Sequence, residues 1–151
     1  MELNPKQIDE YYGQVPHRIM GGQAYFHQLD DSQKLDIRNF EALAINFENG
    51  TTLTFECARN GESLLVKNND KKFTEIDMGE YGRATVSEIE TIPDFYFLFN
   101  ATINLRPILD IFGRLVGITL QTQHLSAYHI LNLGDTLALS KVMPPDFRYW
   151  S

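Results

Sequence analysis

Hydrophobic and polar residues alternate with a period of two through the middle of the chain. In ALAINFENGTTLTFEC, the side chains of Leu43, Ile45 and Phe47 fall on one face, and a similar alternation resumes after the break. The break contains Asn49 and Gly50, and an Asn-Gly pair between two such runs is typical of a β-hairpin turn. A second Asn-Gly pair precedes ESLLVK. The pattern predicts an antiparallel meander of three strands.

A second stretch, LVGITLQTQHLSAYHILNLGDTLALS, shows a related pattern at a constant offset. The offset aligns Gly61 with Gly134 and Ile45 with Ile118, although few positions are identical. A three-stranded meander cannot cover its own apolar face, so two such units packed together would bury both faces. We therefore expect a duplication, and the alternative is generic alternation of β-strands.

The N-terminus carries the signals of a short helix. Asn4 can cap it, Pro5 suits its first position, and Gln7 stands where a capping box is completed. We expect the helix to run to about Tyr12 and to end at Gly13.

Four other segments have local signals. We expect a turn at Gly21 and Gly22 and then a strand in QAYFHQ, and the alternation in TVSEIE predicts another strand. The aromatic run PDFYFLF predicts a strand that is buried on both faces. In LRPILDIFG, Pro107 and Gly113 indicate a single helical turn.

Together these elements predict an α+β fold, predominantly antiparallel β, with a short N-terminal helix. We expect a single domain over residues 1–151, with pseudo-repeats at about 34–67 and 107–141. The chain has 151 residues, 43% of them hydrophobic, which is enough for a core without metals or disulfides. The tail MPPDFRYW has two prolines, and we expect its aromatic residues to fold back onto the body.

The charge balance narrows the range of partners. With 13 basic and 20 acidic residues the formal net charge is −7, which disfavours nucleic-acid binding and favours association with a cationic protein. The alternative is an acidic surface that serves only solubility. The start MELNPKQIDEYY has no signal-peptide pattern, and no apolar run is long enough to span a membrane. We expect a cytoplasmic protein without a membrane partner.

Residues suited to catalysis or metal binding are scattered. Cys57 is the only cysteine, so neither an intrachain disulfide nor a thiolate cluster can form, and we expect it to be a buried strand residue. The histidines, His17, His27, His124 and His129, lack the spacing of metal ligands. Phosphate-binding glycine motifs and a G-x-S-x-G motif are also missing. We expect no enzymatic activity, no metal and no cofactor.

Two acidic segments, LDDSQKLD and EIDMGEYG, are predicted to lie in loops beside the strands. Loops held on rigid strands commonly carry binding surfaces, and carboxylates would attract Lys or Arg side chains of a partner. The residues that we expect to contact a partner are Asp30, Asp31, Asp36, Asp77, Glu80 and Tyr81.

The two halves LAINFENGTTLTFECARNGESLLV and LVGITLQTQHLSAYHILNLGDTLAL resemble small bacterial two-repeat β proteins, some of them similar to immunity proteins encoded beside toxins. The resemblance covers about half of the chain and implies a cytoplasmic, noncatalytic inhibitor that binds a toxin domain stoichiometrically. Two alternatives stay open. One is a structural homo-oligomer, such as a homodimer, formed by pairing of edge strands. The other is a small-ligand or lipid-type carrier whose cavity is lined by Phe95, Tyr96, Phe97 and Phe99.

Overall fold

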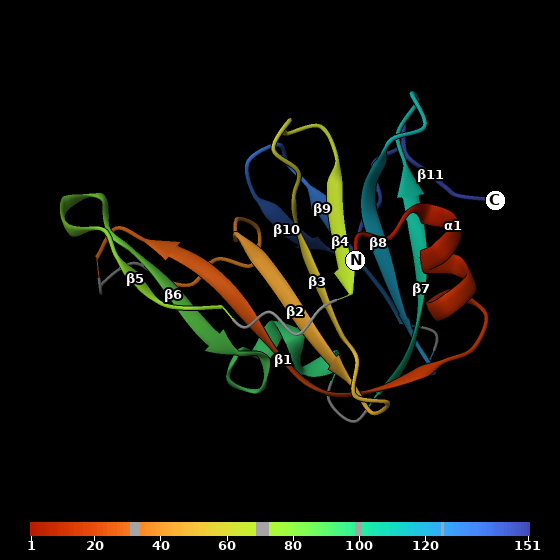
Figure 1. Ribbon diagram of the computed structural model, residues 1–151, viewed down its shortest axis with the longest axis horizontal. Coiled ribbons are helices and arrows are strands. Elements are labelled where there is room, and N and C mark those ends of the chain that lie inside the picture. Colours follow the sequence, from red (N-terminus) through yellow and green to blue (C-terminus); the bar gives the residue numbers. More distant parts are fainter. Residues whose placement is uncertain (31–33, 69–72, 99–100, 125) are drawn as a thin grey trace.

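The chain folds into a twisted antiparallel sheet that curves over on itself (Figure 1). The computed structural model describes residues 1–30, 34–68, 73–98, 101–124 and 126–151. Eight strands follow one hydrogen-bonded path in the order β10-β9-β8-β7-β1-β2-β3-β4, while β11 pairs with β7, β6 with β1, and β5 with β6. The predicted α+β class with mostly antiparallel β structure is confirmed.

The elements in chain order are α1 (Pro5–Ile8), the π-helical turn η1 (Asp9–Gly13), β1 (His17–Gln28), β2 (Ala42–Phe47), β3 (Thr52–Cys57), β4 (Leu64–Asn68), β5 (Ile76–Asp77), the 3₁₀ turn η2 (Gly79–Tyr81), β6 (Arg83–Glu88), the 3₁₀ segments η3 (Ile89–Thr91) and η4 (Pro93–Leu98), β7 (Thr102–Leu109), β8 (Leu115–Thr122), β9 (Ala127–Asn132), β10 (Leu137–Ser140) and β11 (Arg148–Tyr149).

Strand β1 is the centre of the fold because it pairs with three other strands. Its start pairs with β7, its middle with β2, and its last six residues with β6 on the other edge. The expected turn at Gly21 and Gly22 is wrong, since both residues lie inside β1. An irregularity in the register between Ile19 and Gly21 bends the strand there, and a β-carbon at Gly22 would collide with the carbonyl oxygen of Ala44 in β2.

Both ends of the eight-strand path are covered by other parts of the chain. Beside β10, the amide of Leu137 donates to the carbonyl oxygen of Phe40 (2.7 Å), and Phe40 donates back (2.9 Å). Beside β4, the amide of Leu3 donates to the carbonyl oxygen of Val66 (2.8 Å). These hydrogen bonds protect edges that would otherwise be open to pairing with other chains.

The core fills the space inside the curved sheet. Three phenylalanines lie in its middle, where Phe40 contacts Phe26 (5.8 Å between ring centroids) and Phe95 (6.0 Å). The strand predicted for PDFYFLF is wrong, because residues 93–98 of this run form the 3₁₀ segment η4, which buries Phe95 and Leu98 and exposes Tyr96. Buried side chains recur every third residue, at Ile92, Phe95 and Leu98, which matches the three-residue turn of a 3₁₀ helix rather than the two-residue period of a strand.

The N-terminal helix begins with the predicted capping box. The Asn4 side chain accepts from the Gln7 amide, and the Gln7 side chain accepts from the Asn4 amide, both at 2.9 Å. Regular α-helix ends earlier than expected, at Ile8, and continues as the π-helical turn η1. Ile8 and Tyr12 are buried, so this end of the chain covers part of the core next to β7.

Both predicted meanders form, as β2-β3-β4 and β8-β9-β10. Their strand registers differ, because Ile45 pairs with Leu53 whereas Ile118, its counterpart, pairs with Ile130. The offset that aligns the two stretches would have placed Ser126 opposite Ile118. The pseudo-repeat is therefore not confirmed.

The helical turn expected in LRPILDIFG is wrong, since Pro107 lies within β7. A proline is tolerated in a strand near an edge or a bulge, where a ladder N–H can be spared, and the register between β7 and β8 is irregular beside it, between Ile108 and Leu109. The carbonyl of Pro107 points toward the tail and accepts from the Trp150 amide (3.0 Å), at a place where β1 has already diverged from β7. As expected, the tail is docked. Its aromatic and aliphatic side chains Met143, Phe147 and Tyr149 pack on Ile108, Val116 and Leu131.

We expect Gly22→Ala to destabilise the protein by about 3 kcal/mol, because its β-carbon would push β1 away from Ala44. Gly50→Ala is the control, since it has a positive φ of 88° but nothing within 4 Å of a new β-carbon. It should cost only about 1 kcal/mol. Urea unfolding of both variants measures the difference, and equal losses would contradict the proposed close approach.

Candidate interaction surface

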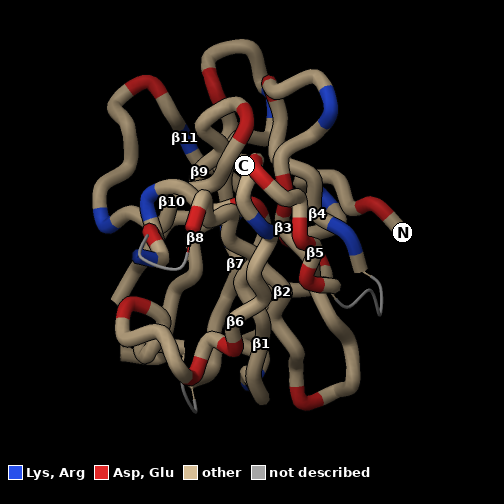
Figure 2. The backbone as a smooth tube through the Cα atoms, turned by 90° about the vertical axis from the view of Figure 1, so that its left-hand side faces the viewer, with Lys and Arg blue, Asp and Glu red and all other residues tan. Residues whose placement is uncertain are grey.

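A three-stranded arm projects from the body of the molecule (Figure 1). It consists of residues 23–28 of β1 together with β6 and β5, paired in that order. Because β1 continues from the body into the arm without a linker, the arm is held by the same hydrogen bonds that hold the sheet. Figure 2 faces this side of the molecule and shows acidic positions on and around β5.

The tip of the arm carries exposed apolar side chains. Tyr81 is 70% exposed, Leu29 63% and Ile76 52%, and Met78 lies between β5 and η2. Sequence reasoning found Tyr81 but missed the other three, although Ile76 and Met78 alternate with acidic residues in the quoted segment.

Backbone contacts hold the tip in place. His27 in β1 makes a hydrogen bond through Nε2 with the carbonyl oxygen of Tyr81 (2.8 Å). The amide of Gly79 donates to the Asp77 carboxylate (2.9 Å), and the amide of Met78 donates to Gly82 (2.8 Å). A partner would therefore meet a surface that is already ordered.

Four of the six predicted contact residues lie in the arm, although they derive from two segments far apart in the sequence: Asp30 beside Asp77 of β5, and Glu80 and Tyr81 in η2. Asp30 and Asp77 line a shallow groove of about 340 Å³ that also includes Leu29, Glu75, Ile76, Gly79, Gly82, Arg83 and Ala84. The tip defined by Leu29, Asp30, Ile76, Asp77, Met78, Glu80 and Tyr81 is called the arm tip below.

The other two predicted residues are not part of the arm tip. Asp36 accepts hydrogen bonds from the backbone and side chain of Arg38, and the next residue, Ile37, accepts from the Leu139 amide in β10. Asp36 thus belongs to the segment that covers β10. Asp31 lies outside the described residues.

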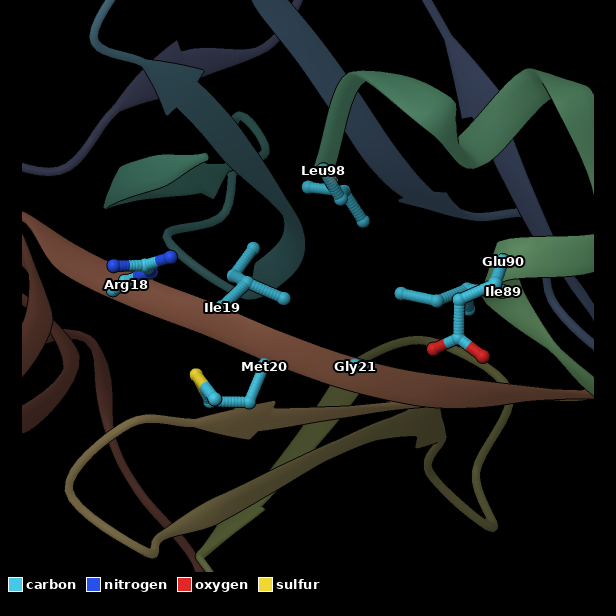
Figure 3. Close-up of a pocket in the computed structure, with 7 residues that line it drawn as sticks. All are labelled: Arg18, Ile19, Met20, Gly21, Ile89, Glu90 and Leu98. Carbon is cyan, nitrogen blue, oxygen red and sulfur yellow. The ribbon is translucent and has the colours of Figure 1, made fainter. Parts of the chain in front are cut away.

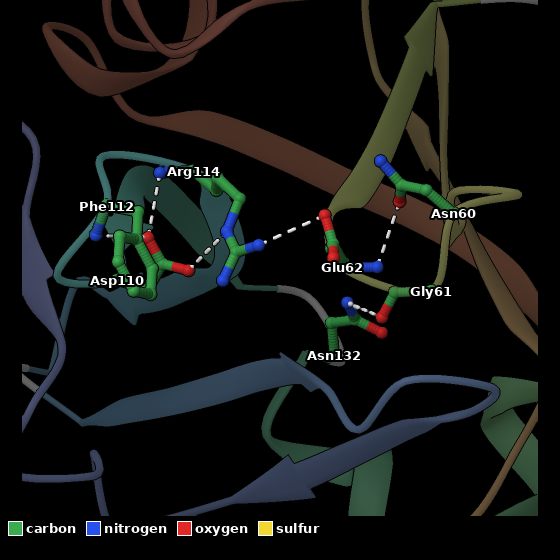
Figure 4. Close-up of polar contacts among 7 residues, drawn as sticks. All are labelled: Asn60, Gly61, Glu62, Asp110, Phe112, Arg114 and Asn132. Carbon is green, nitrogen blue, oxygen red and sulfur yellow. Dashed lines mark hydrogen bonds and ion pairs between the residues drawn. The ribbon is translucent and has the colours of Figure 1, made fainter.

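The two turns that look alike in sequence meet, and Figure 4 shows the contact between Asn132 and Gly61. A β-carbon on Gly61 would lie 3.4 Å from the carbonyl oxygen of Gly134. Asn132 joins the turns, because its side-chain nitrogen donates to the Gly61 carbonyl (3.3 Å) while its side-chain oxygen accepts from the Gly134 amide (3.0 Å).

Cys57 lies at the edge of an acidic groove of about 220 Å³, lined by Tyr25, Glu41, Ala42, Glu56, Phe73 and Asp135. Its thiol donates to the Asn132 side chain (2.9 Å). Burial, and then the charges of Glu41, Asp135 and Glu56, raise the pKa of Cys57 to about 11. At neutral pH this residue is a protonated thiol, which is a poor nucleophile.

His129 is buried beneath the C-terminal tail. Its Nδ1 atom lies 2.8 Å from the Thr119 hydroxyl, which is 3.2 Å from the Tyr149 hydroxyl. The Arg106 guanidinium sits over the Tyr149 ring at 3.7 Å. Burial lowers the pKa of His129. This histidine helps to hold the tail. It lies far from Cys57 in the sequence and on a different strand.

Of the aromatic residues proposed to line a carrier cavity, the three that the structure describes have different surroundings. Phe97 stacks on Tyr128 at 3.7 Å, Phe95 is in the core, Tyr96 is exposed, and Phe99 lies outside the described residues. These positions lend the carrier alternative no support.

Beside this segment lies a pocket of about 60 Å³, lined by Arg18, Ile19, Met20, Gly21, Ile89, Glu90 and Leu98. Figure 3 shows Arg18 and Glu90 on either side of the apolar residues. Sites for drug-sized ligands are usually about 300 Å³ or larger, so this pocket suits no such ligand.

Comparison with protein-family models, curated proteins and solved structures gives no match to this chain. Within the described ranges, His, Cys, Asp and Glu side chains form no group of three or more that could hold a metal ion. The same part of the chain contains no helix that is long and apolar enough to cross a membrane.

We expect iodoacetamide to modify native Cys57 about a hundredfold more slowly at pH 8 than the urea-unfolded chain, because the raised pKa leaves little thiolate. Mass spectrometry of timed samples measures both rates. Equal rates would mean that the thiol is not held protonated by its surroundings.

We expect the free energy of unfolding to decrease as the pH falls from about 7 to about 5, since unfolded His129 binds a proton more readily than the buried side chain. His129→Gln should lose less stability over this range. Asp110 also loses stabilisation in acid, but at lower pH, as the pH falls through the ordinary carboxyl range and below it, because its pKa is lowered in the folded chain. Urea unfolding at several pH values separates the two, and an unchanged pH dependence in His129→Gln would contradict the assignment.

Proposed function

We propose that this protein is a noncatalytic protein-binding module that binds a basic protein through the arm tip. The observation that carries the proposal is the combination of exposed Tyr81, Leu29 and Ile76 with the carboxylates of Asp30 and Glu80 on a rigid extension of the sheet. Aromatic anchors supply contact area, and the surrounding charges speed the encounter and select the partner.

The most concrete form of this function is stoichiometric inhibition of a toxin domain in the cytoplasm, as an immunity protein does. The support is the net charge of −7, since a basic nuclease-type toxin would be attracted to an acidic inhibitor. The high pKa of Cys57 also favours binding over nucleophilic catalysis.

The test is the rate of association with the protein encoded beside the gene for this chain. Asp30→Lys combined with Glu80→Lys should slow association at least about tenfold at low salt, because it reverses the charge at the arm tip. Stopped-flow fluorescence measures the rate at several salt concentrations.

The control is Asp94→Lys combined with Asp146→Lys, which makes the same change in net charge at two exposed positions outside the arm. It should slow association much less. If both double variants slow association by the same factor, only net charge matters and the arm tip is not the binding site. If a basic partner binds the arm variant at the wild-type rate, the proposal is wrong.

A further inference from the structure

The C-terminal tail, residues 141–151, covers one face of the strands β7, β8 and β9. In β7, Leu105 belongs to the main core, whereas Ile108 lies on the opposite face, beneath the tail. In β9, Ile130 and Leu131 divide in the same way, as neighbouring residues of a strand do. The tail therefore packs on a small apolar cluster of its own, and the sheet separates this cluster from the main core.

The tail is a cover that is not itself enclosed. The side chains below it are buried, since Ile108 is 0% exposed, Thr119 1% and His129 5%. In the tail, whose residues are all described, no residue is buried, and even Tyr149 and Trp150 keep part of their surface in solvent. Opening of the tail would expose the face below it and would leave the buried residues of the main core where they are.

A short stretch of backbone pairing holds the tail. β11 is two residues long and pairs with β7, and beyond it the Trp150 amide donates to the Pro107 carbonyl oxygen (3.0 Å). Pro144 and Pro145 lack the N–H group that would extend the pairing toward β10. Segments with few buried residues and few backbone hydrogen bonds open locally at a lower free-energy cost than core strands do.

A chain of polar groups connects the tail to His129. The Tyr149 hydroxyl lies 3.2 Å from the Thr119 hydroxyl, which lies 2.8 Å from Nδ1 of His129. Burial lowers the pKa of His129. With the tail open, this ring would be in water and its pKa would return toward the ordinary value, so the open form binds a proton more readily than the closed form. By linkage, a fall in pH through the ordinary histidine range shifts the equilibrium toward the open form.

The charged groups around His129 offer a protonated ring little compensation. β8 and β10 contain no charged residue. Arg106 is the charged residue of β7, and its guanidinium sits 3.7 Å from the centroid of the Tyr149 ring. The other titratable groups of the surrounding elements are Tyr128 in β9, Lys141 after β10, and Asp146 and Arg148 in the tail. Of these only Asp146 is negative, and it is exposed.

We propose that the tail is a strap that opens as a unit while the body stays folded, and that protonation of His129 favours the open form. The open form exposes the apolar cluster of Ile108, Val116 and Leu131, which the closed strap keeps from solvent. Figure 1 shows β11 and the C-terminus on the side of the molecule away from β5 and β6, so the strap and the arm tip are separate surfaces. The strap goes beyond the proposed function and does not depend on it.

Amide hydrogen exchange measured by NMR tests the proposal, because opening of the strap breaks the hydrogen bond of the Trp150 amide. At about pH 7 the protection factor of this amide should be at least about tenfold smaller than those of the β8 amides, since local opening is easier than global unfolding. From about pH 7 to about pH 5 it should fall at least about twofold further, because the open form takes up a proton at His129.

His129→Gln should remove most of this pH dependence. His124→Gln is the matched control, because it replaces an exposed histidine outside the strap, and it should keep the pH dependence of the wild type. Tyr149→Phe keeps the ring beside Arg106 but removes the hydroxyl bound to Thr119. This variant should lower the Trp150 protection factor about threefold, as expected for one lost hydrogen bond, and leave those of the β8 amides unchanged.

Equal protection of the Trp150 and β8 amides in the wild type would overturn the proposal, because the tail would then open only with the body. An unchanged pH dependence in His129→Gln, or its loss in His124→Gln, would also overturn it. If His129→Gln fails to fold, Tyr149→Phe decides. A wild-type Trp150 protection factor in that variant, or an equal loss of protection in β8, would mean that the strap does not open as a separate unit.

Discussion

Strand β1 has to pair with three neighbouring strands. The rest of the architecture depends on the close approach of its backbone to β2, which allows this pairing. At Gly22 the backbone leaves no room for a β-carbon beside the Ala44 carbonyl, so β1 stays bonded to β2 while its ends reach β7 and β6. Body and arm are thus parts of one strand. The direction of the arm is set by the hydrogen bonding of the body rather than by a flexible linker.

The covered edges decide what kind of binding is available. The N-terminal segment bonds to β4 through Leu3, and the segment before β2 bonds to β10 through Phe40. Strand addition, a common way to bind peptides, would have to displace these segments at either end of the eight-strand path. Recognition at the turns therefore has to rely on side chains. The arm tip, where apolar side chains are exposed on fixed backbone, meets that requirement.

Local signals in the sequence predicted local structure well. The capping box at Asn4 and the hairpin at Gly50 each depend on residues only a few positions apart, so neighbouring residues are enough to specify them. Prediction failed where tertiary packing decides. Pro107 is accommodated because β1 diverges from β7 beside it, and the aromatic run before position 99 follows the core as a 3₁₀ segment.

The candidate site shows the same limit. Asp30 and Glu80 could be selected as acidic loop residues, but their meeting with Leu29 and Ile76 depends on the pairing of β1 with β6 and of β6 with β5. The likeness of the two Gly-acid turns has a related cause. Gly61 and Gly134 have positive φ angles of 71° and 109°, a backbone conformation that favours a residue without a side chain in both turns. That shared backbone conformation accounts for the likeness without a duplication, and the strand registers on either side differ. Asn132 holds the two turns together, because a movement of the β9-β10 turn away from the β3-β4 turn would have to break its hydrogen bond to Gly61.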